Sequence, residues 1–363
     1  MHEQSLDVNR TNTPRAKRVG RLLLRHWSTV FVILMLIFFS VTGRGFLSFQ
    51  NFQDILVAAT SVLLLGIGVT FVIITAGIDL SVGFTMGLSA VIMASIIRVG
   101  MSLGIPVVFG ILAGIALACV AGTAAGIVNG LLVALLRVPP FIATLGMYGI
   151  AFGTALVISG GFPIGNLPTV VGSLGNRYIL YFLPGEWTQL FSMPADVPAN
   201  QLRDVVRAVP LVTVFVIVVT GFMIVVLSKT QFGKHVYAVG NSQEVARRAG
   251  IKAKKVLIQV YSISGLFAAL AGIAYVFRFA SGHARAGEAH MLNAIAAVVI
   301  GGASLYGGTG KIQGTIIGAL IIAILQVGLV TMGVQPFFQY IAIGSVIIIG
   351  VLLDQISKGK IRD

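Results

Sequence analysis

The chain has 363 residues, of which 57% are hydrophobic and 10% are charged, and its mean hydropathy is +0.98. These values lie far from those of soluble globular domains, and recurrent apolar runs of about 18 or more residues exclude disorder and collagen. The runs are continuously apolar instead of alternating, which excludes a β-barrel, so helices must satisfy the backbone within lipid. The composition therefore predicts an all-α, polytopic transmembrane helix bundle.

The net charge of +14 does not indicate a nucleic-acid partner, because the positive residues flank the apolar runs instead of clustering on one polar domain. The single cysteine, Cys119, lies inside an apolar run, which excludes an intrachain disulfide and a thiolate metal cluster. Residues 1–26 are polar and basic and lack the apolar core of a cleavable signal peptide. We expect them to form a cytoplasmic segment in front of an uncleaved membrane anchor.

Ten apolar runs follow in chain order, and we expect each to be a transmembrane helix. They are residues 27–41, 55–76, 82–97, 106–136, 141–159, 209–227, 256–277, 291–305, 312–332 and 337–353. With both termini in the cytoplasm, 18 of the 25 Lys and Arg residues, including every lysine, fall on the inner side. This bias follows the positive-inside rule and supports an even number of spans.

The expected organisation is a membrane domain at 27–353 followed by a cytoplasmic tail at 354–363. A long outer loop lies at 160–208, and a cytoplasmic loop lies at 228–255. The runs that start at Ile55 and Val256 cross in opposite directions, and each precedes a Gly-rich interruption. We hypothesise that they begin two halves related by an inverted repeat, an arrangement that is common in transporters.

The segment Gly77–Gly83 places an acidic residue, Asp79, between the second and third runs. A carboxylate at membrane depth is costly unless it is hydrogen-bonded or hydrated. Asp79 can cap the N-terminus of the third helix, or it can act as a gate or pathway residue, and the two roles are compatible. Asn129 and Gln326 are amides within apolar runs, for which interhelical hydrogen bonding competes with a place in the pathway.

The Gly-rich stretch 301–311 ends in Gly-Lys, which invites a comparison with phosphate-binding loops. The position of the required first glycine is Leu305, and Ile312 replaces the Ser or Thr after Lys311, so the motif fails. The polar segments also lack paired carboxylates, metal ligands and a nucleophile constellation. We therefore expect neither ATPase nor other enzyme activity, and no cofactor or metal.

The polar island 228–255 is the longest inner loop and contains a compact helix signature. Asn241 or Ser242 can cap this helix, and Glu244 occupies the position of a capping-box acid. We predict a helix of about two turns over 243–249, outside the bilayer. It is either a helix that docks on a partner or a solvated connector.

The outer loop 160–208 contains the aromatic residues Phe182, Trp187 and Phe191 beside Glu186. We hypothesise that this loop contacts an external protein partner through an amphipathic surface. A lid over the bundle is the alternative.

Four segments carry a family resemblance. They are GIDLSVG at 77–83, PPFIATLG at 139–146, FGKHVYAVGNSQEVARRAGI at 232–251 and AIAAVVIGGASLYGGTGKIQGTIIGA at 294–319. Together they resemble the permease subunits of bacterial ABC importers of the ribose, xylose and galactose type, and the similarity spans nearly the whole chain. The GIDLS version, with Asp79, is more similar to the sugar branch than to the branched-chain amino-acid branch.

The resemblance implies a type II-like ABC importer membrane domain in the bacterial cytoplasmic (inner) membrane. It also implies three protein partners: a second copy of the permease or a close homologue, a cytoplasmic ABC ATPase and an extracytoplasmic sugar-binding protein. In that family a Glu-x-Ala-x-x-x-Gly-Ile pattern marks the coupling helix that docks into the ATPase. The residues of this chain that match the pattern or lie on the helix are Glu244, Ala246, Arg247, Arg248, Gly250 and Ile251. Val245 stands where the family more often has alanine, and Gly250 is expected to be left-handed.

An ion-coupled secondary transporter or a channel also fits the composition. Ion coupling normally uses charged residues buried at mid-membrane, whereas Asp54, Asp79 and Arg98 all fall at the ends of runs. We therefore expect an ATP-driven importer for a ribose-type monosaccharide or a related sugar or polyol. Within ABC importers, a branched-chain amino-acid or nucleoside permease is the alternative.

Overall fold

The computed structural model describes residues 27–194, 197–198, 201 and 204–357. The predicted cytoplasmic segment 1–26 and residues 358–363 of the predicted tail lie outside these described residues. Within them, the chain forms the helices α2 to α14 and one three-stranded sheet.

Each of the ten predicted membrane runs coincides with one helix. The helices are α2 (Trp27–Thr42), α3 (Phe49–Ile74), α4 (Val82–Ser102), α5 (Val107–Ala134), α6 (Pro140–Ser159), α8 (Leu211–Lys229), α11 (Ala253–Phe279), α12 (Glu288–Ile300), α13 (Ile312–Thr331) and α14 (Pro336–Ser357). Seven of them are long and apolar enough to cross a membrane, and the apolar parts of α2, α12 and α14 are shorter. The predicted polytopic helix bundle is therefore confirmed.

The eighth predicted span differs from the structure, because α12 ends at Ile300 and not at Leu305. Its 13 residues extend about 20 Å, which is too short for a hydrocarbon core of about 30 Å. An irregular segment, 280–287, precedes α12 and lies against α4, where the carbonyl oxygens of Ala284 and Gly287 approach Gly87 and Gly83. This crossing therefore combines an irregular segment with a short helix.

The packing of the helices supports the hypothesised inverted repeat. In this repeat α3 to α6 correspond to α11 to α14 in order. Helix α11 packs on α4 and α5 of the other half, and its counterpart α3 packs on α12 and α13. Helix α4 likewise packs on α5 and α6, as α12 packs on α13 and α14. The first helices of the two halves, α3 and α11, are antiparallel, since Gly68 lies against Ser264 and Gly77 against Tyr261. The core is centred on α3, in which every residue from Val62 to Ile74 is buried.

The segment predicted as an outer loop, 160–208, contains more structure than a loop. A short helix, α7 (Thr169–Gly175), precedes the strands β1 (Tyr178–Leu183), β2 (Trp187–Leu190) and β3 (Val206–Pro210). The sheet has the order β2-β1-β3 and is antiparallel, with Leu180 paired to both Leu190 and Ala208.

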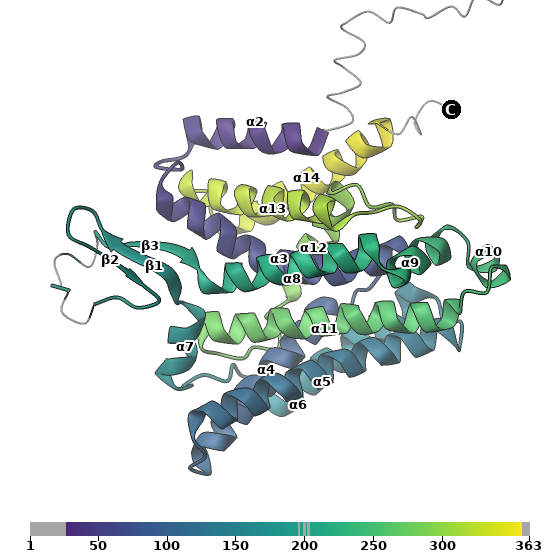
Figure 1. The fold of residues 1–363 in the computed structure, drawn as a ribbon, viewed down its shortest axis with the longest axis horizontal. Helices are drawn as coiled ribbons and strands as arrows, with labels where there is room; N and C mark the ends of the chain where they lie inside the picture. The colour runs from purple at the N-terminus through teal and green to yellow at the C-terminus, as the bar shows by residue number, and fades with distance from the viewer. Residues whose placement is uncertain (1–26, 195–196, 199–200, 202–203, 358–363) are drawn as a thin grey trace, which may run out of the picture.

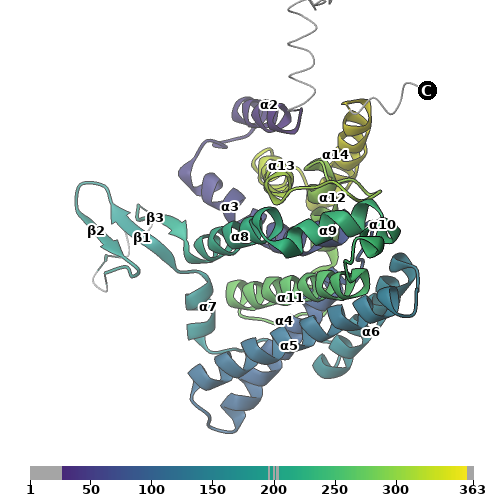
Figure 2. The ribbon, with the colours of Figure 1, turned by 45° about the vertical axis from the view of Figure 1, so that its right-hand side comes forward.

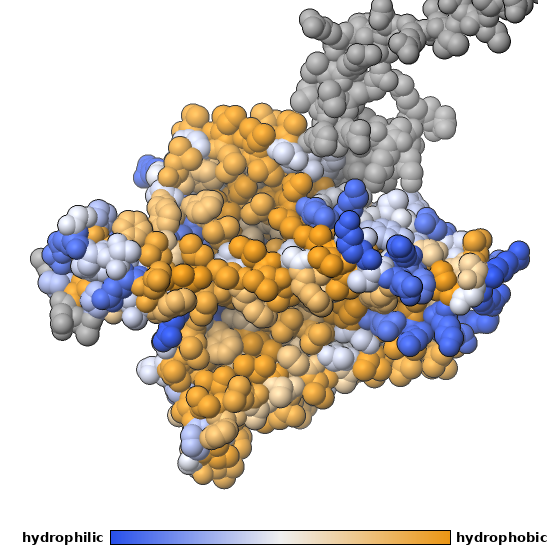
Figure 3. Space-filling view, viewed as in Figure 1, coloured by the Kyte–Doolittle hydropathy of each residue, from blue (hydrophilic) through white to orange (hydrophobic). Residues whose placement is uncertain are grey.

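The sheet and the short helices α9 (Gln231–Asn241) and α10 (Gln243–Arg248) lie at opposite ends of the molecule (Figures 1 and 2). Between these ends the visible surface is almost continuously hydrophobic, and hydrophilic side chains gather at the sheet and around α9 and α10 (Figure 3). A lipid-facing belt bounded by two aqueous surfaces has this distribution. From the charge bias of the sequence we expect the α9–α10 end to face the cytoplasm.

Candidate functional site

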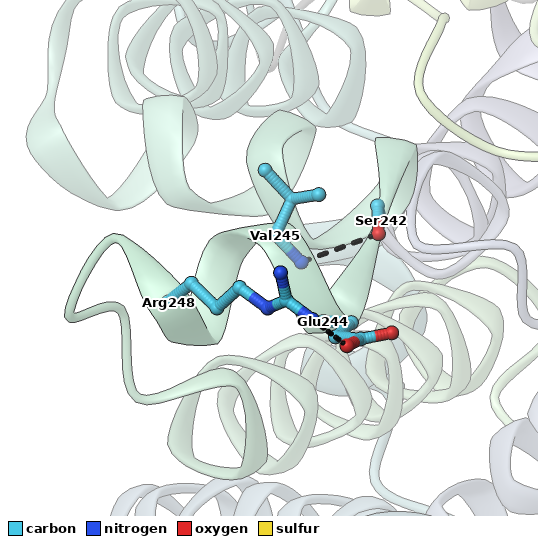
Figure 4. A network of polar contacts seen from close by, with 4 residues as sticks. All are labelled: Ser242, Glu244, Val245 and Arg248. Carbon is cyan, nitrogen blue, oxygen red and sulfur yellow. Dashed lines mark hydrogen bonds and ion pairs between the residues drawn. The ribbon is translucent and has the colours of Figure 1, made fainter.

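Helix α10 forms in the loop where a short extramembrane helix was predicted. The hydroxyl oxygen of Ser242 accepts a hydrogen bond of 3.3 Å from the amide of Val245 and caps the helix (Figure 4). Gly250 follows the helix with a φ of +81°, so the predicted left-handed end is confirmed. Ala246 is the buried residue of the helix, and the other residues from Gln243 to Gly250 are exposed.

The capping-box role predicted for Glu244 is wrong. A capping box requires the acid three residues after the cap, and because Ser242 is the cap, that position belongs to Val245. Asn241 cannot be the cap because it is the last residue of α9. Glu244 instead forms an ion pair with Arg248 one turn later (Figure 4), and both side chains are largely exposed. Such a pair adds little stability, so the carboxylate is available for contacts with other molecules.

Helix α9 precedes α10 directly and was not predicted. The hydroxyl of Thr230 caps it by accepting a hydrogen bond from the amide of Gly233, and Val236 and Val239 bury its apolar face. The hydroxyl of Tyr237 donates a hydrogen bond of 2.6 Å to the carbonyl oxygen of Gly310. Burial raises the pKa of this hydroxyl above its usual value, so it remains a neutral donor. The helix is thereby held against the Gly-rich loop 301–311.

The Gly-rich loop 301–311 has a structural role between α9 and the end of α3. The amide of Gly308 donates a hydrogen bond of 2.8 Å to the carbonyl oxygen of Ile74, the last residue of α3. Gly307 and Gly308 both have positive φ, and a Cβ on Gly308 would lie 2.2 Å from the side-chain oxygen of Asn241. The glycines therefore allow α9, the loop and α3 to approach one another closely.

Asp79 lies in the break between α3 and α4 and is 1% exposed. One carboxylate oxygen accepts hydrogen bonds from the amide and hydroxyl of Ser81, at 2.9 and 2.6 Å. The other oxygen accepts a hydrogen bond of 2.7 Å from the hydroxyl of Ser264 on α11. Ser81, and not Asp79, is the N-cap residue of α4, so the predicted capping role holds only indirectly, through the bond to the Ser81 amide.

Asp79 lies between the end of α3 and the start of α4, as predicted, but the expectation that no charge lies in the centre of the bundle is wrong. The hydrogen-bond partner of Asp79, Ser264, lies near the middle of α11, the helix that runs from Ala253 to Phe279. Chain segment 75–81 therefore places the carboxylate inside the bundle beside the centre of a long helix. The sequence contains only a weak signal for the buried position of Asp79. A break between two apolar runs looks the same in a sequence whether it lies at the membrane surface or in the centre of the bundle.

Asn129 joins the same cluster, as its side-chain NH₂ donates a hydrogen bond of 2.9 Å to the hydroxyl of Ser81. Its carbonyl oxygen, the hydroxyl of Tyr261 and the hydroxyl of Thr85 are buried and make no hydrogen bond within the described part of the chain. Buried polar atoms without partners are rare and costly in folded proteins. The cluster of Asp79, Ser81, Asn129, Tyr261 and Ser264 is called the buried polar cluster below.

The structure separates the remaining pathway candidate, Gln326, from the buried polar cluster. Gln326 is half-buried near the end of α13, a helix that packs mainly on α2, α3 and α12. The cluster instead lies among α4, α5 and α11. Asp79 and Asn129 are thus brought together, and Gln326 is not.

Sequence reasoning missed Ser264 and Tyr261 as members of the cluster. Both lie within the apolar run of α11, where isolated hydroxyl groups are common, and only the tertiary arrangement places them beside Asp79. Sequence reasoning also missed a contact of the segment 139–146. The hydroxyl of Thr144 donates a hydrogen bond of 3.1 Å to the carbonyl oxygen of Ile78. The four segments quoted for the resemblance therefore meet around the α3–α4 break.

A bundle of apolar helices in two inverted halves, with a short helix pair at one polar end, defines a multi-pass membrane transport protein. The chain belongs to the family described as branched-chain amino acid transport system / permease component, which matches residues 51–352. No solved structure matches the chain.

Three curated relatives with high coverage are sugar import permeases. The chain is 38% identical to the ribose import permease protein of Bacillus subtilis (strain 168), over 89% of this chain and 90% of the relative. It is 36% identical to the fructose import permease protein of Rhizobium meliloti, over 90% of this chain and 83% of the relative. It is 33% identical to the galactose/methyl galactoside import permease protein of Haemophilus influenzae, over 93% of this chain and 96% of the relative.

Proposed function

We propose that the chain is the membrane-spanning permease subunit of an ATP-driven ABC importer for a ribose-type monosaccharide or a related sugar. The similarity to ribose, fructose and galactose permeases over about nine-tenths of the chain supports the substrate class. The family description names branched-chain amino acids, so those substrates are the second candidate. The GIDLS segment around Asp79 favours the sugar.

The observation that carries the coupling role is the exposed Val245 on α10. Its side chain is 65% exposed on a short helix that otherwise presents charged and polar residues to solvent. A single exposed apolar residue is common on protein surfaces. Val245, however, stands on an exposed helix at the polar end of the molecule (Figure 1) and within the Glu-x-Ala-x-x-x-Gly-Ile pattern, and these features together favour a docking surface. Glu244, Arg247 and Arg248 supply the charged rim, and Ala246, Gly250 and Ile251 position the helix. We propose that α10 inserts into a groove of the partner ATPase.

The path from α10 into the membrane runs through α9. Ser242 caps α10 directly after α9 ends, and α9 packs on the Gly-rich loop, which bonds to Ile74 at the end of α3. Movement of α10 on closure of the ATPase would therefore be transmitted to the α3–α4 break as a rigid-body displacement. We propose that Asp79 and Asn129 act at this break as gate residues, and that Gln326 belongs to a separate part of the pathway.

An ABC importer with one docking helix per permease requires two permease chains, because the ATPase sites function in pairs. We propose a homodimer, or a heterodimer with a close homologue, embedded in membrane lipid. An extracytoplasmic binding protein would deliver the sugar to the sheet end of the molecule, opposite α10 (Figure 1).

Transport in proteoliposomes tests this function. The permease, its ATPase and its binding protein are reconstituted, and uptake of radiolabelled ribose and leucine is measured with and without ATP in the compartment that contains the ATPase. We expect ribose uptake that requires ATP and the binding protein and that survives a protonophore. Leucine uptake would support the amino-acid alternative, and uptake that persists without ATPase but collapses with the protonophore would indicate a secondary transporter.

A further inference from the structure

A cleft of about 450 Å³ lies on the α9–α10 end of the molecule, beside α10. Its walls come from three elements that are distant in sequence: the connection between α5 and α6, helix α10, and the first turns of α11. None of the hydrogen bonds or packing contacts that link α9 to the Gly-rich loop uses this cleft. It therefore remains unexplained by the proposed coupling path.

Positive charge dominates the rim of the cleft. Arg137, Arg247 and Lys254 line it, one from each of the three walls, and Glu244 is the acidic residue among its lining residues. Glu244 is already paired with Arg248, which does not line the cleft. The three cations outnumber the single carboxylate among the lining residues, and this excess of positive charge favours an anionic ligand.

Part of the lining of the cleft and its surroundings are apolar. Val133, Ala134 and Leu257 are among the residues that line the cleft. Leu136 and Ile142, on the two sides of the α5–α6 connection, are 69% and 54% exposed, and we expect these apolar side chains to face lipid. A ligand with an anionic head and apolar tails would contact the cations and these side chains at once.

The backbone of Arg137 adds an independent observation. Arg137 has a φ of +58°, a left-handed conformation that favours glycine and is strained for other residues. Strained residues tend to occur where the side chain has a function, and Arg137 is one of the residues that line the cleft.

We propose that this cleft binds the headgroup of an anionic phospholipid from the cytoplasmic leaflet, with Arg137 and Lys254 as the principal contacts. This proposal rests on the proposed function only for the orientation of the chain in the membrane. It does not depend on the transported substrate or on ATP. Because Gln243, Glu244 and Arg247 of α10 form one wall, a bound lipid would fix the position of the coupling helix relative to α5 and α6. The lipid would therefore help to preorganise α10 for its partner.

Lipid retention by the purified permease alone tests the site. The permease is placed in nanodiscs that contain equal parts of phosphatidylglycerol and phosphatidylcholine, and retained lipids are measured by native mass spectrometry. We expect selective retention of phosphatidylglycerol, and we expect Arg137→Gln/Lys254→Gln to weaken it about 30-fold, from the contribution of two cations near an anionic surface. The matched control is Lys229→Gln/Lys234→Gln, which removes two exposed cations of the same end that do not line the cleft.

Each other outcome would overturn the proposal. Equal loss in both double variants would mean that the surface charge attracts lipid without a site. Displacement of the lipid by soluble inorganic phosphate at low concentration would assign the cleft to a free anion. Unchanged lipid retention in Arg137→Gln/Lys254→Gln, combined with loss of ATPase binding, would assign the cleft to acidic residues of the ATPase. Lipid retention is measured without the ATPase or the sugar. A negative result would therefore overturn the lipid site without contradicting the proposed transport function.

Discussion

Gly308 donates a backbone hydrogen bond of 2.8 Å to the carbonyl oxygen of Ile74, across more than two hundred residues of sequence. Ile74 ends α3, and the break that follows contains Asp79. Gly308 in turn lies against Asn241, the last residue of α9. The bond and the contact with Asn241 together connect α9 to the helix break, and they form the route that we propose for coupling.

The contact between α9 and α3 predicts that Gly240→Ala uncouples transport. A Cβ at this position would lie 1.8 Å from the carbonyl oxygen of Ile74, so the two elements must separate. Overpacking of this kind costs about 1–3 kcal/mol. We expect fewer sugar molecules transported per ATP hydrolysed, with the ATPase still bound. The matched control is Gly146→Ala, where a Cβ meets nothing within 4 Å. An unchanged ratio of transport to hydrolysis in folded Gly240→Ala would contradict the route.

The buried polar cluster predicts an asymmetry between two serines of α11. Ser264→Ala removes a hydrogen-bond donor from the buried carboxylate of Asp79 and should destabilise the protein by about 1–3 kcal/mol. Ser262→Ala removes only a local bond to the carbonyl oxygen of Ile258 and should change stability by less than about 0.5 kcal/mol. Thermal unfolding in detergent measures both changes. Equal melting temperatures for the two variants would show that Ser264 does not support Asp79.

The end of α10 predicts a difference between two substitutions of Gly250. Its φ of +81° is costly for a β-branched residue, by about 1–2 kcal/mol, whereas asparagine tolerates this conformation. No atom lies within 4 Å of a Cβ at this position, so the effect comes from the backbone alone. We expect Gly250→Val to reduce the amount of ATPase that copurifies and Gly250→Asn to retain it. Full copurification with Gly250→Val would mean that the helix end does not position the docking surface.

The outer sheet predicts a contact with the binding protein through Glu186. This residue lies in the exposed turn between β1 and β2, where its carboxylate accepts a hydrogen bond of 3.2 Å from the side chain of Gln201. We expect Glu186→Lys to weaken association of the binding protein about tenfold and to leave ATPase assembly unchanged. Asp204→Lys, an equal charge reversal at another exposed position of the same segment, is the control. Titration of labelled binding protein into nanodiscs that contain each variant gives both affinities. Equal weakening by the two variants would mean that association depends on the net charge of the segment and not on Glu186.

The sequence predicted the elements that depend on local pattern. Ten apolar runs each became a helix, because a continuous apolar stretch in lipid must satisfy its own backbone. Helix α10 also followed from local signals, with Ser242 at its start and Gly250 at its end. The exact cap could not be decided between Asn241 and Ser242, since that choice depends on where α9 ends. The role assigned to Glu244 was wrong for this reason.

Features that depend on tertiary packing could not be predicted. The depth of Asp79 is set by how the irregular segments 75–81 and 280–287 lie against α11 and α4, and neither segment has a periodic pattern. The sheet in the segment 160–210 pairs strands of four to six residues, which are too short to give a clear alternation. Helix α9 is amphipathic, but its buried residues contact loop 301–311 and the end of α3, which only the folded chain brings together.

Photo-crosslinking shows whether α10 docks into the ATPase through Val245. A photo-reactive amino acid is placed at position 245, and in a second variant at Leu190, which is 61% exposed in the sheet at the opposite end. Both variants are irradiated in the assembled importer that transports sugar. We predict a crosslink to the ATPase from position 245 and none from position 190. A transport-competent complex in which position 245 forms no crosslink to the ATPase would contradict the claim.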